Sequence, residues 1–155
     1  NIPGFEKASI SAVGTQIGIR ETRRIDGQYA LTIEDVVSGK KFEDTIALSG
    51  YPIDIHDPTG RGVQANDIKG DGSYGIPYRS LVPKKIENLL VAGRCISTTH
   101  EALATTRLTP SAMATGQAAG TAAALSLIDQ VAPKDVDVSK LKAILVENGV
   151  MLPNE

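Results

Sequence analysis

The sequence lacks several of the features that would fix a class of function on their own. Among its 155 residues there is one cysteine, Cys95, and the net charge is only -2. One cysteine excludes an intramolecular disulfide, a CxxC redox pair and an iron–sulfur cluster ligated by this chain alone. The small net charge gives no sign of a nucleic-acid-binding surface or a polybasic membrane anchor.

Long apolar runs are also missing. No stretch reaches the ~20 residues of a membrane-spanning helix, and no charged-then-apolar leader opens the sequence. We therefore expect a cytoplasmic protein that binds neither membranes nor nucleic acids. No phosphate-cradling GxGxxG of the kind that opens a dinucleotide-binding fold is identified in the chain, which starts at Asn1 rather than methionine. The first absence predicts a fragment of a longer protein; the second fits either a fragment or removal of the first residues by processing.

What is present fits an ordinary globular domain of mixed structure. Hydrophobic residues make up 41% and charged residues 22% of the chain, and a chain of this length buries roughly 70% of its unfolded surface. The predicted class is α/β, or α+β for the isolated fragment, in three parts. Residues 1–83 form an antiparallel β-rich part, 84–130 a closing strand and helix, and 131–155 a linker with a short helix.

In the first part, local signals predict turns, strands and one short helix. Asp26-Gly27 lies between RRI and QYALT, a strong two-residue hairpin signal, so its flanks should pair as antiparallel strands. Thr32 and Asp35 have the spacing of a helix N-terminal cap, which predicts a short helix or a turn over 33–37. Alternating apolar residues from 51 to 55 predict a half-buried strand.

In the second part, the apolar run 88–92 predicts a strand covered on both faces, ending at Gly93-Arg94. Thr109 and Pro110 suit the cap and first turn of the helix that follows. Ser139 should cap another short helix in the third part. Along the longer helix, small residues recur every four positions, which predicts a smooth ridge packed closely against a sheet or a ligand: Ala112, Gly116, Gly120 and Ala124.

Four segments together resemble the C-terminal portion of a family of FAD-dependent oxidoreductases with a glutathione-reductase-like flavin fold. They are IGIRETRRIDGQYALT, YPIDIHDPTG, YGIPYRSLVPKKIENLLVAGRCISTTHEA and TRLTPSAMATGQAAGTAAAL. The resemblance implies FAD as the cofactor of the full-length protein. It also implies that a missing N-terminal part holds the ADP half of FAD, while residues 88–127 meet the flavin half.

The resemblance implies roles for residues around the strand end and the helix start. Gly93 would let the backbone approach the ribityl or phosphate chain, and Arg94 would donate a charged hydrogen bond to it. Open N–H groups at Ser111 and Ala112 would face the N1–C2=O edge of the flavin, where electron density gathers on reduction. The cofactor-binding candidates are Gly93, Arg94, Arg107, Thr109, Pro110, Ser111 and Ala112.

Each of these roles has an ordinary structural alternative. A glycine such as Gly93 commonly forms a turn, an arginine such as Arg94 caps a surface, and most helix ends bind only water or side chains. Arg107 would meet a phosphate or a substrate carboxylate, or else form a structural ion pair.

No catalytic residue is identified, and three weak candidates remain. His56 stands on the polar face of its strand, where an imidazole acts as acid or base or is simply a hydrogen-bonded surface group. Arg20, in a run of arginines, would bind an acidic substrate or pair with Glu21. Tyr78 would line a site for a flat ligand or only pack. His100-Glu101 begins like a zinc-protease motif, but no second histidine follows four residues later, so no metal site is predicted.

These features together predict a fragment that supplies the flavin-side half of an FAD site and part of the site for a small-molecule substrate. Its partner would be the missing N-terminal part, and the apolar run 88–92 predicts either an exposed patch or a homodimer. The alternative is a non-catalytic module for ligand binding or subunit interaction. The isolated fragment should be colourless and inactive, because the contacts to the pyrophosphate and adenosine of FAD should lie elsewhere.

Overall fold

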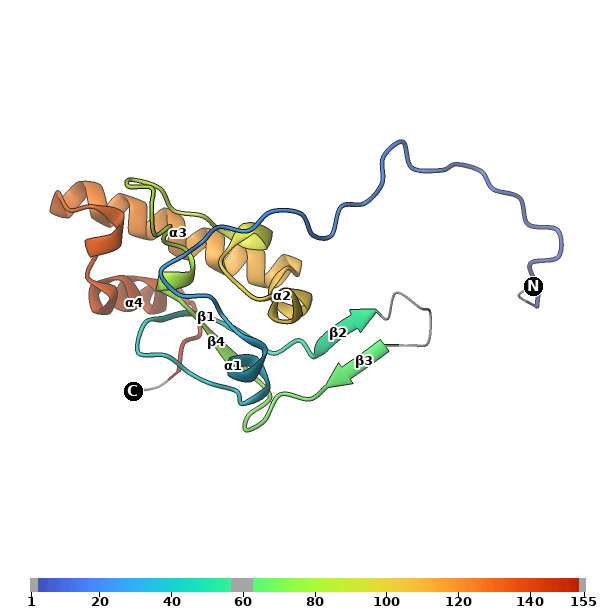
Figure 1. Ribbon diagram of the computed structural model, residues 1–155, viewed down its shortest axis with the longest axis horizontal. Helices are drawn as coiled ribbons and strands as arrows, with labels where there is room; N and C mark the ends of the chain where they lie inside the picture. The colour runs from blue at the N-terminus through green and yellow to red at the C-terminus, as the bar shows by residue number, and fades with distance from the viewer. Residues whose placement is uncertain (1–2, 57–62, 154–155) are drawn as a thin grey trace.

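A computed structural model of the chain describes residues 3–56 and 63–153. It has the mixed helix and antiparallel strand content that the sequence predicts. The long helix α3 packs over a small sheet, a second hairpin projects to one side, and the N-terminal arm runs away from the body (Figure 1). The elements are α1 Ile33–Val37, β1 Thr45–Ser49, β2 Ile53–His56, β3 Val63–Asn66, β4 Tyr74–Pro77, α2 His100–Thr106, α3 Thr109–Asp129 and α4 Val138–Glu147, with short 3-10 turns at Tyr78–Ser80, Gly93–Cys95 and Pro133–Asp135.

The capping motif predicted at Thr32 is confirmed and begins α1. The Asp35 N–H donates to Thr32 Oγ1 at 3.3 Å, and the Thr32 N–H donates back to the Asp35 carboxylate at 3.1 Å. The same carboxylate accepts hydrogen bonds from Tyr29 Oη at 2.7 Å and Lys40 Nζ at 3.0 Å. Burial alone would raise the pKa of Asp35, but these hydrogen bonds outweigh it and hold the pKa below its usual value.

Two separate antiparallel pairs make up the strands. β1 pairs with β4, and β2 pairs with β3, so the strand predicted over 51–56 is confirmed as β2, which begins two residues later. Gly75 lies in β4 opposite Leu48 of β1, and a Cβ there would lie 2.3 Å from Thr45 Oγ1. A larger residue would therefore clash with Thr45 at this position. Gly70, Gly72 and Gly75 have a GxGxxG spacing that the sequence analysis did not identify, but they form a turn and the start of a strand rather than a strand-to-helix phosphate cradle.

The hairpin predicted at Asp26-Gly27 is wrong. Instead of pairing with each other, its flanks pair with distant residues: Gly27 bridges to Pro83, and the Ile25 N–H donates to the Cys95 carbonyl at 3.0 Å. The Lys84 N–H donates to the Asp26 carbonyl at 2.9 Å. The Asp26-Gly27 dipeptide favours a turn, but no hairpin forms, because several backbone hydrogen bonds to distant residues outweigh one local turn.

The strand predicted over 88–92 is also not formed. Asn88 adopts a left-handed φ of 55°, Leu89 is 38% exposed, and the backbone bond recorded for this run is the Val91 N–H to the Leu81 carbonyl at 2.9 Å. A buried strand needs neighbours on both edges for its N–H and C=O groups. No strand among the described residues lies beside this run, so it stays an extended loop.

Helix α3 begins at Thr109, one residue earlier than predicted, with Leu108 as its N-cap. The predicted ridge does not pack against the sheet of this chain, and its contact with a ligand stays a prediction. Gly116 and Gly120 are exposed, and a Cβ added at either would have nothing within 4 Å. The face turned to the core is a different row: Ser111, Thr115, Ala118, Ala122, Leu125 and Ser126.

The hydrophobic core joins residues from all three parts of the sequence. Leu31 and Ile46 come from the first part, Ile96 and Leu125 from the second, and Leu141 from α4 in the third. Each fully buried Leu or Ile contributes roughly 1.5–3 kcal/mol. α4 begins at Val138 with Asp137 rather than the predicted Ser139 as its N-cap. Among the described helices, none combines the length and apolar character that crossing a membrane requires.

Candidate functional site

The turn at Gly93 is tied directly to the first turns of α3. The Gly93 N–H donates to Thr115 Oγ1 at 3.0 Å, and the Thr115 hydroxyl donates in turn to the Ser111 carbonyl at 2.8 Å. Gly93 has a φ of 72°, which favours glycine, and a Cβ there would lie 3.5 Å from the Ala112 Cβ. The close approach that the sequence suggested for a ligand is thus made to α3 itself.

The amino end of α3 carries no acidic residue in its first turn and no side-chain cap. The Ala112 N–H, expected to be open, donates to the Leu108 carbonyl at 2.9 Å, so that expectation is wrong. Ser111 Oγ is buried against Ser49 Oγ at 3.1 Å. The amides that precede the first helical hydrogen bond are those of Thr109 and Ser111, since Pro110 has none.

A hollow of about 390 Å³ opens beside this helix end, and we call it the arginine hollow. Three guanidinium-bearing side chains line it from three separate segments: Arg20 on the N-terminal arm, Arg94 in the Gly93–Cys95 turn, and Arg107 at the end of α2. Arg94 donates to the Ile19 carbonyl, which holds the arm against the turn. The whole lining is Ile19, Arg20, Arg94, Ala104, Arg107, Leu108 and Thr109.

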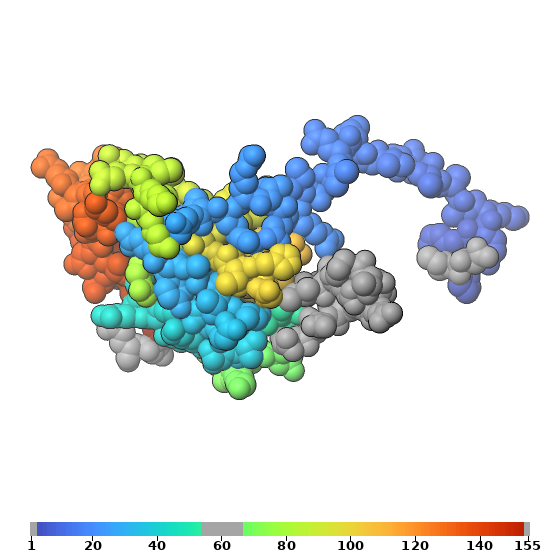
Figure 2. Space-filling view, viewed as in Figure 1, coloured from blue at the N-terminus to red at the C-terminus, as the bar shows by residue number. Residues whose placement is uncertain are grey.

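The acidic group next to the arginine hollow already has its own partners. Glu21 forms an ion pair with Arg24, and its other carboxylate oxygen lies 2.7 Å from His100 Nδ1. These contacts lay the arm across α2, and Figure 2 shows the blue N-terminal segment passing over the yellow surface there before it leaves the body. Arg107, the C-cap residue directly after α2, is seven residues from His100, so the two lie on one side of that helix.

The comparisons with known proteins decide the family. Residues 1–145 match the family described as FAD dependent oxidoreductase. The chain belongs to this family. The matched range includes the arginine hollow and all of α3. Neither the comparison with curated proteins nor that with solved structures gave a match.

Of the catalytic candidates of this FAD-dependent oxidoreductase family member, the two whose side chains the structure describes, Arg20 and Tyr78, are not brought together. Tyr78 is buried in the core, its hydroxyl donates to the Pro133 carbonyl at 2.6 Å, and burial raises its pKa to about 12. It has no free hydroxyl for chemistry near neutral pH. His56 ends β2, and its side chain lies outside the described part of the chain. Arg20 lines the arginine hollow, whereas Tyr78 does not.

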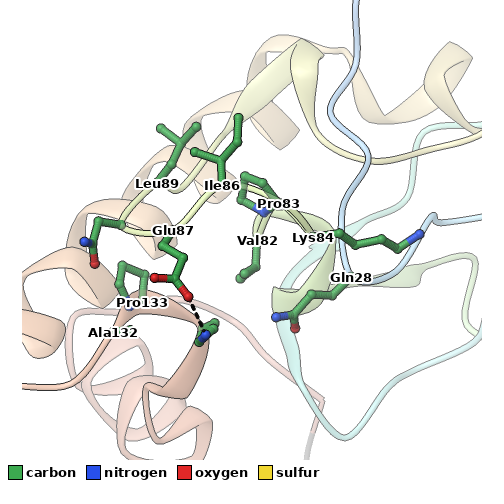
Figure 3. Close-up of a pocket in the computed structure, with 11 residues that line it drawn as sticks. Gln28, Val82, Pro83, Lys84, Ile86, Glu87, Leu89, Ala132 and Pro133 are labelled. Atoms are coloured by element: carbon green, nitrogen blue, oxygen red, sulfur yellow. Dashed lines mark hydrogen bonds and ion pairs between the residues drawn. The ribbon is translucent and has the colours of Figure 1, made fainter.

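A second pocket lies between the loop 82–89 and the residues before α4 (Figure 3). Its volume is about 50 Å³, enough for a few waters and far below the ~300 Å³ or more of a small-molecule site. Lys134 and Glu87 bridge it at 2.9 Å. This pocket is therefore no site for a flavin. Within the described residues, no group of three metal-ligating side chains gathers.

Three features of the site in this FAD-dependent oxidoreductase family member were not predicted from the sequence. Thr115 joins the Gly93 turn to α3, yet a threonine inside a helix gives no signal of such a bond. The pairing of Glu21 with His100 joins segments 79 residues apart, and no local pattern predicts it. The buried helix α2 was also not predicted, although Thr99 caps it and supplied a signal.

Proposed function

We propose that the chain supplies the flavin-side half of an FAD site and part of the substrate site in an FAD-dependent oxidoreductase. The observation that carries this proposal is the amino end of α3, uncapped and free of acidic residues, beside Gly93 and Arg94 in a chain that belongs to the family. The glutathione-reductase-like arrangement of the flavin domain is part of the proposal. When bound, FAD accepts an electron pair from an organic substrate.

The residues at this helix end fit a flavin by their chemistry. An electron-rich ring edge is favoured by about 0.3–1 kcal/mol at a helix amino end, and an acidic side chain there would oppose it. The amides of Thr109 and Ser111 precede the first helical bond and are available as donors. Ala112, whose N–H is already used, packs against Gly93 and holds the turn in place.

The outer face of α3 supports a partner that carries the nucleotide half. Met113, Leu127 and Ile128 are 71%, 81% and 71% exposed, with Gly116 and Gly120 between them. A helix that is apolar on all sides is normally buried. We propose that a nucleotide-binding unit covers this face in the working enzyme, where the small residues would allow close packing. A flavin domain needs such a unit for the pyrophosphate and adenosine of FAD.

The exposed face also keeps the alternative function open. A module for subunit interaction would use the same apolar surface without a flavin. An absorption titration with FAD separates the two: the chain mixed with a family nucleotide-binding unit should retain a stoichiometric flavin band through gel filtration. Retention by that unit alone, with no change when the chain is added, would favour the interaction module.

A further inference from the structure

The arginine hollow carries a surplus of positive charge. Arg20, Arg94 and Arg107 line it, and none of the carboxylates that the structure describes does. Among the described residues, neither the Arg20 nor the Arg107 guanidinium has an acidic partner, and that of Arg94 binds only the Ile19 carbonyl. Like charges gathered around one hollow repel each other, and a bound anion relieves that repulsion.

The charge is not balanced by a neighbouring acid that could turn inward. Glu21, beside Arg20 in the chain, is held by Arg24 and His100. Glu101 is exposed at the start of α2, and a hydrogen bond from its own backbone N–H is the main reason that its pKa lies below its usual value. The described carboxylates near the hollow therefore do not neutralise its arginines, and an anion from outside the chain can do so.

The geometry suits oxygen anions of a small organic molecule. A guanidinium presents paired N–H donors that match the two oxygens of a carboxylate or of a phosphate. The three arginines come from three different segments of the chain and line one hollow. Together they offer hydrogen-bond donors for more than one oxyanion. A volume of about 390 Å³ is in the range of small-molecule sites.

We propose that the arginine hollow anchors the carboxylate groups of the oxidoreductase's substrate, which would be a small di- or tricarboxylate. This assignment rests on the proposed flavin edge at the amino end of α3, because Thr109 belongs to both. The pyrophosphate of FAD is the other source of an oxyanion. The hollow is open and its Arg20 is exposed, which suits a group that enters and leaves at each turnover.

Succinate, ADP and inorganic phosphate are the probes, with binding followed by backbone amide NMR shifts of the whole chain. Succinate should bind saturably and shift the amides around Arg94 and Arg107. Arg107→Gln and Arg20→Gln should each weaken it about tenfold or more, as loss of one charge-assisted hydrogen bond implies. Arg23→Gln, outside the lining, is the matched control and should leave the affinity unchanged. Binding should also weaken as salt is raised.

Three results would overturn the proposal. They are no saturable succinate binding, equal affinity in the Arg107→Gln and Arg23→Gln variants, or ADP binding to the hollow more tightly than succinate. Amide spectra of each variant show whether it is folded. The Arg107→Lys variant keeps the positive charge but lacks the paired N–H donors of a guanidinium, so it should recover only part of the affinity for succinate. Since no flavin is added, loss of the flavin proposal would leave the succinate result intact.

Discussion

The Gly93 N–H donates to Thr115 Oγ1 at 3.0 Å, across 22 residues of sequence. This bond joins the turn that carries Arg94 to the helix end that would face a flavin. Thr115 is buried, and its hydroxyl also donates to the Ser111 carbonyl. One side chain therefore sets the distance between the two halves of the candidate site.

Replacing Thr115 with valine should destabilise the chain by about 1–3 kcal/mol, because the shape is kept while the partly buried Gly93 N–H loses its acceptor. Thr115→Ser keeps the hydroxyl and should cost less. Thr121→Val removes a hydroxyl bonded only to the Gln117 carbonyl and is the matched control. Urea unfolding followed by circular dichroism gives the free energies, and equal losses at 115 and 121 would contradict the bond's role.

Replacing glycine with alanine should change the stability of the chain in opposite directions at two positions. Gly93→Ala places a side chain at a φ of 72° and should cost about 1–2 kcal/mol. Gly120→Ala meets nothing within 4 Å on the outer face of α3 and should stabilise the helix by roughly 0.8–1 kcal/mol. Thermal melts of both variants measure this. A destabilised Gly120→Ala variant would mean that the outer face is already packed in the isolated chain.

Stability should fall in acid through Asp35. The pKa of its carboxyl is lowered in the fold, so its contribution is complete above the unfolded value of about 3.9 and is lost as pH falls through the folded pKa. Asp35→Asn should cost about 1.5–3 kcal/mol at pH 7, with the difference shrinking below about pH 4. Glu34→Gln, exposed in the same turn, is the control. A constant difference between pH 7 and pH 2 would exclude this linkage.

The outer face of α3 should make the isolated chain self-associate. Met113, Leu127 and Ile128 together expose an apolar surface, and burying it in a pair of chains is favourable. Light scattering over a range of concentrations should show association that Leu127→Lys reduces. Val146→Lys changes an exposed apolar residue on α4 and should have no such effect. A monomer at every concentration would argue against this surface as a docking face.

Sequence patterns predicted most accurately the local structures that are stabilised by contacts between residues close together in the chain. The capping residues Thr32 and Asp35 lie three positions apart, and their mutual hydrogen bonds form within one turn of α1. The Asp26-Gly27 signal was equally local, but the segments around it bond to residues near 83 and 95 instead. Local pattern therefore succeeds only where no distant segment competes for the same backbone groups.

The candidate site could be predicted only in part. The loop at Gly93 and the start of α3 followed from sequence, yet the direction of α3 did not, because its two faces are both small and apolar. Buried Ala118 and exposed Gly120 have similar polarity, so periodicity cannot separate them. The arginine hollow joins positions 20, 94 and 107, and only the fold brings these together.

The most direct test of the flavin-side assignment is an amide NMR titration of the chain with FMN, which carries the flavin but not the adenosine half of FAD. Weak binding suffices for this measurement. The account predicts that the largest shifts fall on Gly93, Thr109 and Ser111, and that Thr115→Val reduces them by loosening the turn. Shifts confined to other surfaces, such as the small pocket near Lys134, or no shift at millimolar FMN, would contradict it.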